Sequence, residues 1–543
     1  YRDLFERSKN ALDFLRRQGV QKNEAVMLQI SRPENFLTVF WGAILGGMVP
    51  VPLASMMTLG RGKNELDKTA SIFEILGRPL LVTDCATKQS LETKSKLLEQ
   101  AKFTIATVEE ALSHQSATRV KLSPSEANDT AFIQFSSGST GSPKGVCLSH
   151  QNLLHNIVSI IEHQDGKPTD CFVSWLPLFH DMGIIGYHLL PLVLQAKQVL
   201  MPPRLFMKRP LSWLQALDRH QGTCTASPNF GLTRGLSKLD SKQVEQLSLH
   251  QVHCLLNGSE PISAEIMNSF VQLLEPAGFP PNAMSPGYGL AEGSLCISAR
   301  PAHSLPEVHH IDRRTLTQKN EVIVSLEPTS NSVPFVEVGT AVPGVSIRIV
   351  DESDQIIAQG RVGHIQIRGP NVTKGYYRDP SRSAKAFNGE WFRTGDLGLI
   401  LDGRLIITGR HKDVIFVGGQ NFYSHDIEES LADLPWFEPG RVAVFGSNDP
   451  KTGRDQICLA GVFNNTLEAP EEQVQLTLQR VSEVFGIRLD FVIRVRPNEI
   501  PKTSSGKLQR HKLRETFENR GFKDQVAMQP TPPRTTIESP PAS

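Results

Sequence analysis

Serine, threonine, glycine and lysine residues gather in one stretch, Phe132 to Val146, which reads FIQFSSGSTGSPKGV. The run from Thr130 to Phe135 is aromatic and β-branched and predicts a strand, and the glycines that follow allow a tight turn with exposed backbone amides. Hydroxyl, amide and ammonium donors in such a turn can surround a polyanion. The stretch therefore predicts a phosphate-binding loop, and its candidate residues are Ser136, Ser137, Gly138, Ser139, Thr140, Gly141 and Lys144.

The lysine of this stretch follows Pro143, so the stretch differs from the G-x-x-x-x-G-K-[ST] loop of P-loop NTPases. We predict the next helix only after Ser149, which is a suitable N-cap. A flexible linker rich in glycine and serine is the alternative interpretation of the same composition.

Further polar side chains stand at the ends of strand-like apolar runs. His180 and Asp181 follow CFVSWLPLF, Tyr288 and Glu292 lie in SPGYGLAEG, and Asp396 ends WFRTGD. The carboxylate of Glu292 suits Mg²⁺, that of Asp396 suits two vicinal ribose hydroxyls, and the ring of Tyr288 can stack on a purine. Each also has a structural alternative: a His-Asp contact, a solvated glutamate, a capping aspartate or a core tyrosine.

The order of these motifs along the chain resembles that of the adenylate-forming superfamily of acyl-CoA synthetases, luciferases, peptide-synthetase adenylation domains and fatty acyl-AMP ligases. Six motifs occur in family order, from SSGSTGSPKG to PKTSSGK. The motif WLPLFHDMGIIG is similar to the corresponding motif of the fatty acyl-AMP ligases. Ala291 also resembles these enzymes, since most of the superfamily has Thr at this position.

The resemblance implies functional roles for residues along the whole chain. The resemblance assigns catalysis to His180, Glu292 and Lys507, and Lys502 is the alternative to Lys507. It also assigns Mg²⁺ binding to Glu292 and the hinge between domains to Lys412. The acid-binding residues are His180, Asp181, Met182, Gly183 and Ile185. Beyond the phosphate loop, the nucleotide-binding residues are Gly258, Ser259, Glu260, Pro261, Tyr288, Gly289, Leu290, Asp396 and Arg410.

The alternation of strands and helices predicts an α/β protein, and the length of 543 residues predicts more than one domain. The resemblance implies a large N-terminal domain over residues 1–409, made of layered α/β parts and a small β-barrel. A mobile α+β lid would cover residues 410–519, and the Pro-rich residues 520–543 would be a linker or tail. Residues 304–344 resemble the insertion of fatty acyl-AMP ligases, which implies restricted lid motion and poor use of CoA.

Composition limits the remaining classes of function. Lys plus Arg number 57 and Asp plus Glu 56, so we expect no nucleic-acid partner. No apolar run reaches the ~18 residues that span a bilayer, and we expect a cytoplasmic protein. The seven cysteines are scattered, which favours reduced thiols. We interpret His303, His309 and His310 as a solvated surface and predict no transition-metal site there.

The implied activity is conversion of a fatty acid and ATP to an acyl-adenylate and pyrophosphate, with Mg²⁺, followed by acyl transfer to the pantetheine thiol of an acyl carrier protein. The carrier protein would act in cis or in trans. This chain could thus be the loading domain of a polyketide or hybrid synthase. A fatty acyl-CoA ligase is one alternative, but it would have no use for residues 304–344. A non-catalytic acyl- or adenylate-binding module is another, although Glu292, Asp396 and Lys507 are all present. The motif HDMG disfavours an amino-acid-activating domain.

Overall fold

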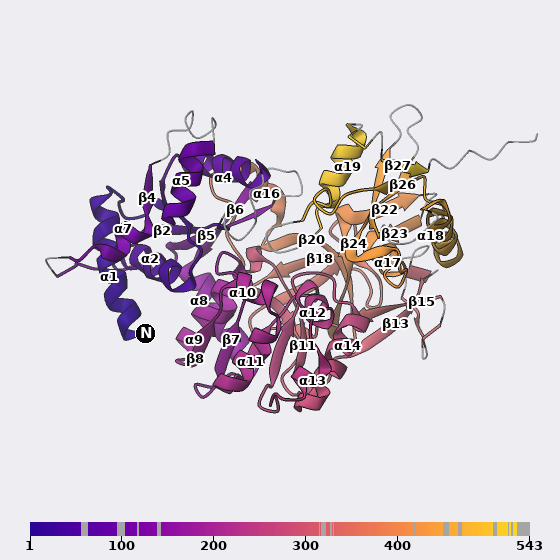
Figure 1. Cartoon of the computed structure of the whole chain (residues 1–543), viewed down its shortest axis with the longest axis horizontal. Helices are drawn as coiled ribbons and strands as arrows, with labels where there is room; N and C mark the ends of the chain where they lie inside the picture. Colours follow the sequence, from indigo (N-terminus) through magenta and orange to yellow (C-terminus); the bar gives the residue numbers. More distant parts are fainter. Residues whose placement is uncertain are drawn as a thin grey trace, which may run out of the picture. The chain divides into compact units, whose positions relative to one another are not determined.

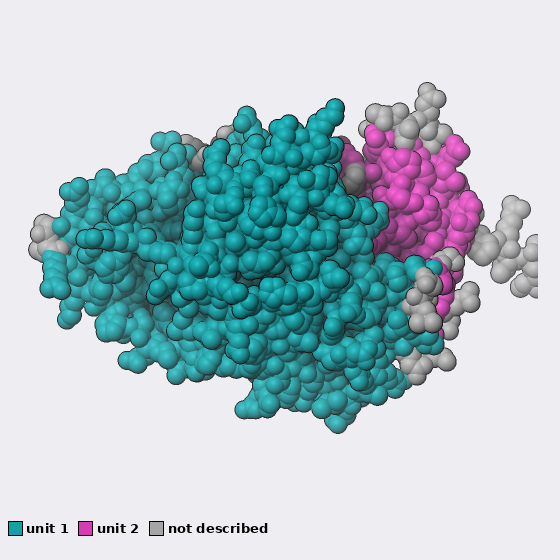
Figure 2. Space-filling view, turned by 90° about the horizontal axis from the view of Figure 1, so that it is seen from below, with its two compact units in different colours: residues 1–311, 321–328, 334–408 teal, residues 312–320, 329–333, 409–543 magenta. Residues whose placement is uncertain are grey.

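The chain forms two compact units, coloured separately in Figure 2. In this computed structural model the described residues are 1–55, 63–94, 104–116, 119–137, 143–313, 315–316, 322–325, 328–329, 331–417, 420–448, 455–464, 470–502, 508–519, 521–522 and 525–528. Unit 1 comprises Tyr1–Ile311, Glu321–Pro328 and Pro334–Thr408, and unit 2 comprises Asp312–Asn320, Thr329–Val333 and Gly409–Ser543. None of the described helices is long and apolar enough to cross a membrane.

The N-terminal part of unit 1 is built on a four-stranded parallel sheet (Figure 1). In spatial order its strands are β2 (Val49–Pro52), β1 (Ala25–Gln29), β3 (Leu80–Thr83) and β4 (Ile105–Thr107). The helices of this part are α1 (Arg2–Arg17), α2 (Pro33–Leu45), α4 (Lys63–Leu76), α5 (Cys85–Lys94) and α7 (Val108–Ser113). β2 and β3 are buried at every position, as expected for parallel strands covered on both faces. An antiparallel hairpin of β5 (Thr130–Ser137) and β6 (Pro143–Ser149) follows.

A seven-stranded sheet forms the centre of unit 1. In spatial order its strands are β16 (Thr340–Ala341), β12 (Cys296–Ala299), β11 (Met284–Gly289), β10 (Cys254–Asn257), β9 (Cys224–Ala226), β7 (Cys171–Ser174) and β8 (Lys197–Leu200). The five strands from β11 to β8 are parallel, and β12 and β16 pair antiparallel. The carboxyl ends of parallel strands all lie on the same side of the sheet, and open α/β sheets bind ligands outside these ends.

Helices and short turns connect these strands. They are α8 (His150–His163), the π-helix η1 (Met182–Leu189), α9 (Leu190–Val193), α10 (Pro203–Lys208), α11 (Leu211–His220), α12 (Asn229–Leu236), α13 (Ser241–Val244), α14 (Ala264–Leu274), η2 (Glu275–Ala277), η3 (Pro281–Ala283) and η4 (Ala291–Gly293). α8 begins as predicted at Ser149, whose hydroxyl accepts from the backbone N–H of Asn152. The Asn152 side chain accepts in return from the N–H of Ser149.

The remainder of unit 1 is antiparallel. The region for which a small β-barrel is expected contains a five-stranded sheet of β17 (Ser346–Val350), β18 (Gly363–Arg368), β20 (Trp391–Leu401), β19 (Phe387–Asn388) and β21 (Arg404–Arg410), with helix α16 (Pro380–Ala386). Asp402 and Gly403 join β20 to β21 with φ values of 48° and 79°, the geometry of a type I′ hairpin turn. Within 304–344, β14 (Val324–Ser325), β13 (Val308–Asp312) and β15 (Ser332–Val336) form a three-stranded sheet.

Unit 2 has its own core around Ile427, Leu431 and Val444. It contains η5 (His411–Asp413), the hairpin β22 (Val414–Val417) and β23 (Gln420–Tyr423), α17 (Ser424–Glu429), α18 (Pro470–Phe485), α19 (Arg510–Glu518) and a sheet of β24 (Phe437–Asn448), β25 (Asp455–Phe463), β26 (Phe491–Arg494) and β27 (Val526–Met528). The predicted α/β class, with a large N-terminal and a smaller C-terminal part, is confirmed.

Candidate functional site

The predicted phosphate loop belongs to the β5–β6 hairpin. Ser136 pairs with Lys144 across the two strands, so both lie next to the hairpin tip. The hydroxyl oxygen of Ser136 is buried and has no hydrogen-bond partner among the described residues. Gly138, Ser139, Thr140 and Gly141 lie outside the described residues, and so does the side chain of Ser137. The roles of these five residues stay predictions.

Lys144, Glu292 and Tyr376 form a partly buried polar cluster. The ammonium nitrogen of Lys144 lies 2.5 Å from Oε1 of Glu292, and the hydroxyl of Tyr376 donates to the same oxygen at 3.0 Å. Glu292 is 5% exposed. Burial alone would raise its pKa, but the charge and hydrogen bond of Lys144 and the hydroxyl of Tyr376 outweigh burial and lower it. Burial and the charge of Glu292 raise the pKa of Tyr376, so the cluster pairs an ionised carboxylate with a neutral phenol.

The backbone places Tyr376 beside the hairpin. Tyr376 forms a β-bridge with Val146, and the N–H of Tyr377 donates to the carbonyl of Gly145 at 2.7 Å. The segment before Tyr376 also fixes the turn that carries Glu292, because the N–H of Thr373 donates to the carbonyl of Glu292 at 2.8 Å. No motif in the sequence predicts a role for Tyr376. Its neighbours in G-Y-Y gave no local sign of a contact with a residue 84 positions away.

Tyr288 and Asp396 meet on another side of this region. Tyr288 lies on β11, Asp396 lies on β20, and the phenol hydroxyl donates to Oδ2 of Asp396 at 2.6 Å. Asp396 is 4% exposed, and its N–H donates to the hydroxyl of Thr394. The structure therefore brings together the residues expected to contact adenine and ribose.

The predicted nucleotide segment from Gly258 to Pro261 follows β10 directly. Ser259 has a φ of 75°, which marks a sharp turn at the end of this parallel strand. Oε1 of Glu260 accepts from the N–H of Phe230 at 2.7 Å, so this carboxylate contacts the start of α12. Gly289 ends β11 and Leu290 precedes η4, which places both between Tyr288 and Glu292.

His180 and Asp181 occupy the turn between β7 and η1. Nδ1 of His180 lies 2.6 Å from Oδ1 of Asp181, which also accepts from the N–H of Met182 at 2.7 Å. A Cβ at Gly183 would lie 2.2 Å from the carbonyl oxygen of Pro177, so only glycine fits this close approach. The side-chain amide of Gln134 on β5 donates to the carbonyl of Phe179, which joins the turn to the hairpin.

A π-helix follows this turn, and the sequence gave no sign of it. Ile185 on η1 has no exposed surface and packs in the hydrophobic core, so its predicted contact with an alkyl chain stays a prediction. His188 is also fully buried. Its Nε2 accepts from the indole N–H of Trp41 at 2.8 Å, and its Nδ1 lies 2.8 Å from Oε1 of Gln198.

Of the residues of unit 2 with a predicted role, the structure describes Arg410 and Lys412 but not Lys507. Arg410 is exposed at the end of β21, and Lys412 lies in η5, close to the division between the units at Thr408 and Gly409. Lys507 lies outside the described residues. The described chain resumes at Leu508 and reaches Arg510, whose guanidinium binds both carboxylate oxygens of Glu428, at 2.8 and 2.5 Å.

Comparison with known proteins identifies the family. The profile of the AMP-binding enzyme family matches residues 1–377. The long-chain-fatty-acid AMP ligase FadD26 of Mycobacterium bovis is 30% identical over 514 residues, covering 90% of this chain and 86% of that protein. The medium-chain-fatty-acid [acyl-carrier-protein] ligase JamA of Moorena producens is 30% identical over 536 residues, covering 95% and 89%. A solved structure from a study of fatty acyl-adenylate ligases of E. coli and L. pneumophila superposes with a TM-score of 0.88 at 28% identity, covering 96% of this chain and 93% of that chain. The chain therefore belongs to the AMP-binding enzyme family and, within it, to the fatty acyl-AMP ligases.

Proposed function

We propose that this protein activates a fatty acid as its acyl-adenylate and passes the acyl group to the phosphopantetheine thiol of an acyl carrier protein. A carboxylate oxygen of the acid attacks the α-phosphorus of ATP, and the bond to pyrophosphate breaks. The thiol then attacks the acyl carbonyl, and AMP leaves. The names of FadD26 and JamA, a fatty-acid AMP ligase and a fatty-acid carrier-protein ligase, support this sequence of steps.

The observation that carries the proposal is the cluster of Lys144, Glu292 and Tyr376 beside the β5–β6 hairpin. The residues present fit a triphosphate, because Ser136 lies opposite Lys144 across the hairpin and its buried hydroxyl has no hydrogen-bond partner among the described residues. They also fit Mg²⁺, since Glu292 offers a buried, ionised carboxylate oxygen. Glu292 would hold the ion, which when bound would offset the charge of the phosphates.

The chain's own side chains then act by positioning and electrostatics. Lys144 supplies positive charge at the phosphates, and Asp396 accepts hydrogen bonds from the ribose. His180 and Asp181 orient the acid at the turn before η1. Lys507, which precedes α19 in the sequence, offsets the charge that develops between the carboxylate and the α-phosphate. No covalent intermediate on the protein is needed.

Incubation with Mg-ATP and fatty acids of graded length, followed by mass spectrometry, tests this proposal. We would offer CoA to one sample and a phosphopantetheinylated acyl carrier protein to another. The proposal predicts acyl-AMP in both samples, and thioester mainly on the carrier protein.

Two outcomes would contradict it. Efficient formation of acyl-CoA would support a fatty acyl-CoA ligase, and failure to form any adenylate, with fatty acid still bound, would support a binding module. The Glu292→Gln variant serves as the matched control, because it keeps the shape of the side chain but loses the charge that pairs with Lys144.

A further inference from the structure

A second polar cluster lies at the amino ends of the parallel strands of the seven-stranded sheet, whereas the residues expected to act in adenylation lie at their carboxyl ends. Asp170, Thr223 and His253 each precede a strand, namely β7, β9 and β10, and Cys224 is the first residue of β9. The residues expected to bind nucleotide follow the carboxyl ends of β10 and β11. β7, β9 and β10 are three to four residues long, which separates their amino ends from their carboxyl ends by about 10 Å.

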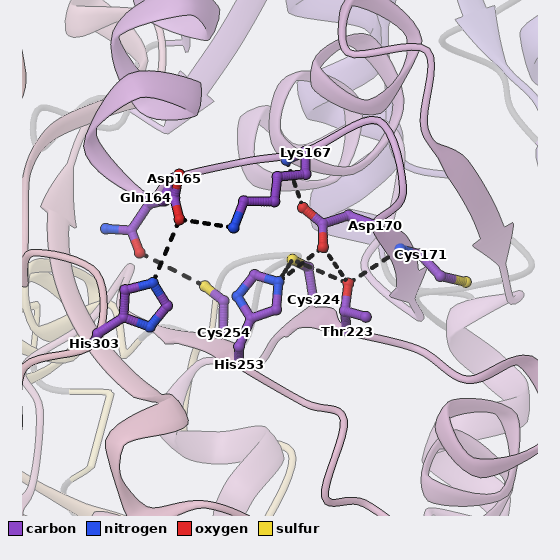
Figure 3. A network of polar contacts seen from close by, with 10 residues as sticks. All are labelled: Gln164, Asp165, Lys167, Asp170, Cys171, Thr223, Cys224, His253, Cys254 and His303. Atoms are coloured by element: carbon purple, nitrogen blue, oxygen red, sulfur yellow. Dashed lines mark hydrogen bonds and ion pairs between the residues drawn. The ribbon is translucent and has the colours of Figure 1, made fainter.

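Three side chains of this cluster face one another, as Figure 3 shows. Nε2 of His253 lies 2.8 Å from Oδ1 of Asp170 and 3.6 Å from Sγ of Cys224. One donor atom from each of the three lies within 4.8 Å of the other two. Asp170 and Cys224 are buried, at 5% and 6% exposure.

Neighbouring groups fix the carboxylate. The hydroxyl of Thr223 donates to Oδ1 of Asp170 at 2.9 Å, and the backbone N–H of Lys167 donates to Oδ2 at 2.7 Å. The N–H of Cys171 donates in turn to the Thr223 hydroxyl. The ammonium of Lys167 pairs with Asp165 instead. Apart from His253, no basic side chain in the described part of the chain forms an ion pair with Asp170.

The donor set of one thiol, one imidazole and one carboxylate is that of Zn²⁺ sites, whereas Mg²⁺ prefers oxygen ligands alone. Tetrahedral Zn²⁺ with its usual bond lengths holds its sulfur and nitrogen ligands about 3.5 Å apart, close to the 3.6 Å seen here. The contact between Asp170 and His253, now 2.8 Å, would have to widen by about 0.5 Å. The side chain of His253 is 32% exposed, which gives an ion and a water molecule access from one side.

Another group of possible ligands, Glu307, His309 and Glu337, is less suitable. The guanidinium of Arg404 lies 2.8 Å from Glu307 and 2.7 Å from Glu337, so a cation already neutralises these carboxylates. The cluster at Asp170 contains no such built-in cation among the described residues.

We propose that Asp170, Cys224 and His253 bind one Zn²⁺ ion, with water as the fourth ligand. The ion links the starts of three neighbouring strands, β7, β9 and β10, and stabilises unit 1. It takes no part in adenylation, because the reacting groups lie at the carboxyl ends of the strands. Without metal, the same residues form the Asp-His hydrogen bond that the structure shows.

Equilibrium dialysis against Zn²⁺ with elemental analysis tests the site in the intact chain of 543 residues. We expect about one ion per chain that excess Mg²⁺ does not displace, and an increase in Tm of roughly 3 °C at a hundredfold excess over Kd. EDTA should reverse the increase. Co²⁺ in place of Zn²⁺ should give the visible spectrum of a tetrahedral thiolate complex.

Matched variants separate this site from other cysteines. Cys224→Ser and His253→Gln should weaken Zn²⁺ binding at least about 100-fold, while their adenylation rate stays within about twofold of wild type. Cys254→Ser removes the neighbouring thiol, which pairs in register with Cys224, and should leave Zn²⁺ binding unchanged. Absence of binding to the wild type, or equal binding by wild type and Cys224→Ser, would overturn the proposal. Loss of binding in Cys254→Ser would overturn this set of ligands.

Discussion

At the scale of single residues, the main feature is that Lys144 and Glu292 neutralise each other. Burying an ionised carboxylate without a charged partner costs free energy. The charge of Lys144 lowers the pKa of Glu292, which keeps the carboxylate ionised in the absence of substrate. In the proposed function, the same ammonium turns to phosphate oxygens when a polyphosphate binds at the hairpin. The hydrogen bond that Tyr376 donates to the carboxylate would then hold Glu292 in place.

Tyr376→Phe should slow adenylation by about 10- to 100-fold, because a hydrogen bond to a charged group contributes about 1.5–3 kcal/mol. Pyrophosphate release at saturating ATP measures the loss, and the Mg²⁺ concentration needed for half-maximal rate should increase. The neighbouring substitution Tyr377→Phe is the control and should have little effect. An unchanged rate in Tyr376→Phe would remove this tyrosine from the site.

Lys507→Ala should abolish adenylate formation and leave the fold intact, because its charge is needed only as the carboxylate attacks phosphorus. Acyl-AMP measured by mass spectrometry and circular dichroism check the two halves of this prediction. Lys502→Ala is the matched control, since its ammonium donates to the carbonyl of Gly440 at 2.9 Å. Normal adenylation by Lys507→Ala would assign the role to another group.

At the scale of elements, η1 buries a titratable side chain next to the predicted acid-binding turn. Burial lowers the pKa of His188 to about 4, whereas an exposed histidine titrates near 6.5. As the pH falls from 6.5 towards 4, the unfolded chain binds a proton that the folded chain excludes. The stabilising effect is complete above pH 6.5 and is lost on acidification.

We therefore expect His188→Gln to flatten the pH dependence of the free energy of unfolding. The wild type should lose about 3 kcal/mol more than the variant between pH 6.5 and pH 4. Glutamine retains an acceptor for the indole N–H of Trp41, so folding at neutral pH should persist. Urea titrations at several pH values measure both curves, and parallel curves would contradict the prediction.

Arg510 anchors the chain three residues after Lys507. Burial would lower the pKa of this guanidinium, but the charges of Glu428 and Asp413 outweigh burial and raise it. Arg510→Ala should destabilise unit 2 by about 3–5 kcal/mol, because Glu428 is left buried without its partner. Hydrogen exchange at α17 and α19 measures the change. Arg480→Ala, which removes an exposed pair with Asp433, should change it little, and equal effects of both variants would contradict the prediction.

The sequence predicted local elements better than contacts between them. The cap at Ser149 follows from local chemistry and is confirmed. The turn at Asp402–Gly403 likewise has the residue types that a type I′ hairpin turn favours. The β6 strand was not foreseen, because Pro143 suggested a rigid loop, although a proline can begin a strand. The π-helix η1 and the contact of Tyr376 depend on packing between distant segments, which no local pattern encodes.

At the scale of the whole molecule, residues 304–344 contribute to both units. In unit 1, Arg404 binds Glu337 of this segment. In unit 2, Arg313 of the segment binds both carboxylate oxygens of Asp426, at 3.1 and 3.0 Å, and its guanidinium lies over the ring of Phe485. Each unit thus fixes its share of the segment with an arginine.

Arg313→Ala should release the segment from unit 2 and increase the yield of acyl-CoA relative to acyl-AMP several-fold, if the segment limits access of CoA as the family resemblance implies. Mass spectrometry of both products gives the ratio. Arg441→Ala, which breaks a more exposed pair with Glu438, is the control. An unchanged ratio, with hydrogen exchange confirming release of the segment, would show that the segment excludes CoA in another way.

The bonds around Glu292 also have a consequence for the order of folding. The Asn152 side chain donates to the carbonyls of Pro370 and Val372, and Asn371 donates to that of Gly293. These contacts join segments up to 220 positions apart. Such long loops close late in folding. During synthesis, the parallel sheet can therefore form before residue 370 is made, whereas the contacts of Asn152 and Gly293 with residues 370–372, and that of Glu292 with Tyr376, can form only afterwards. The chain should thus acquire its shape before it acquires its chemistry.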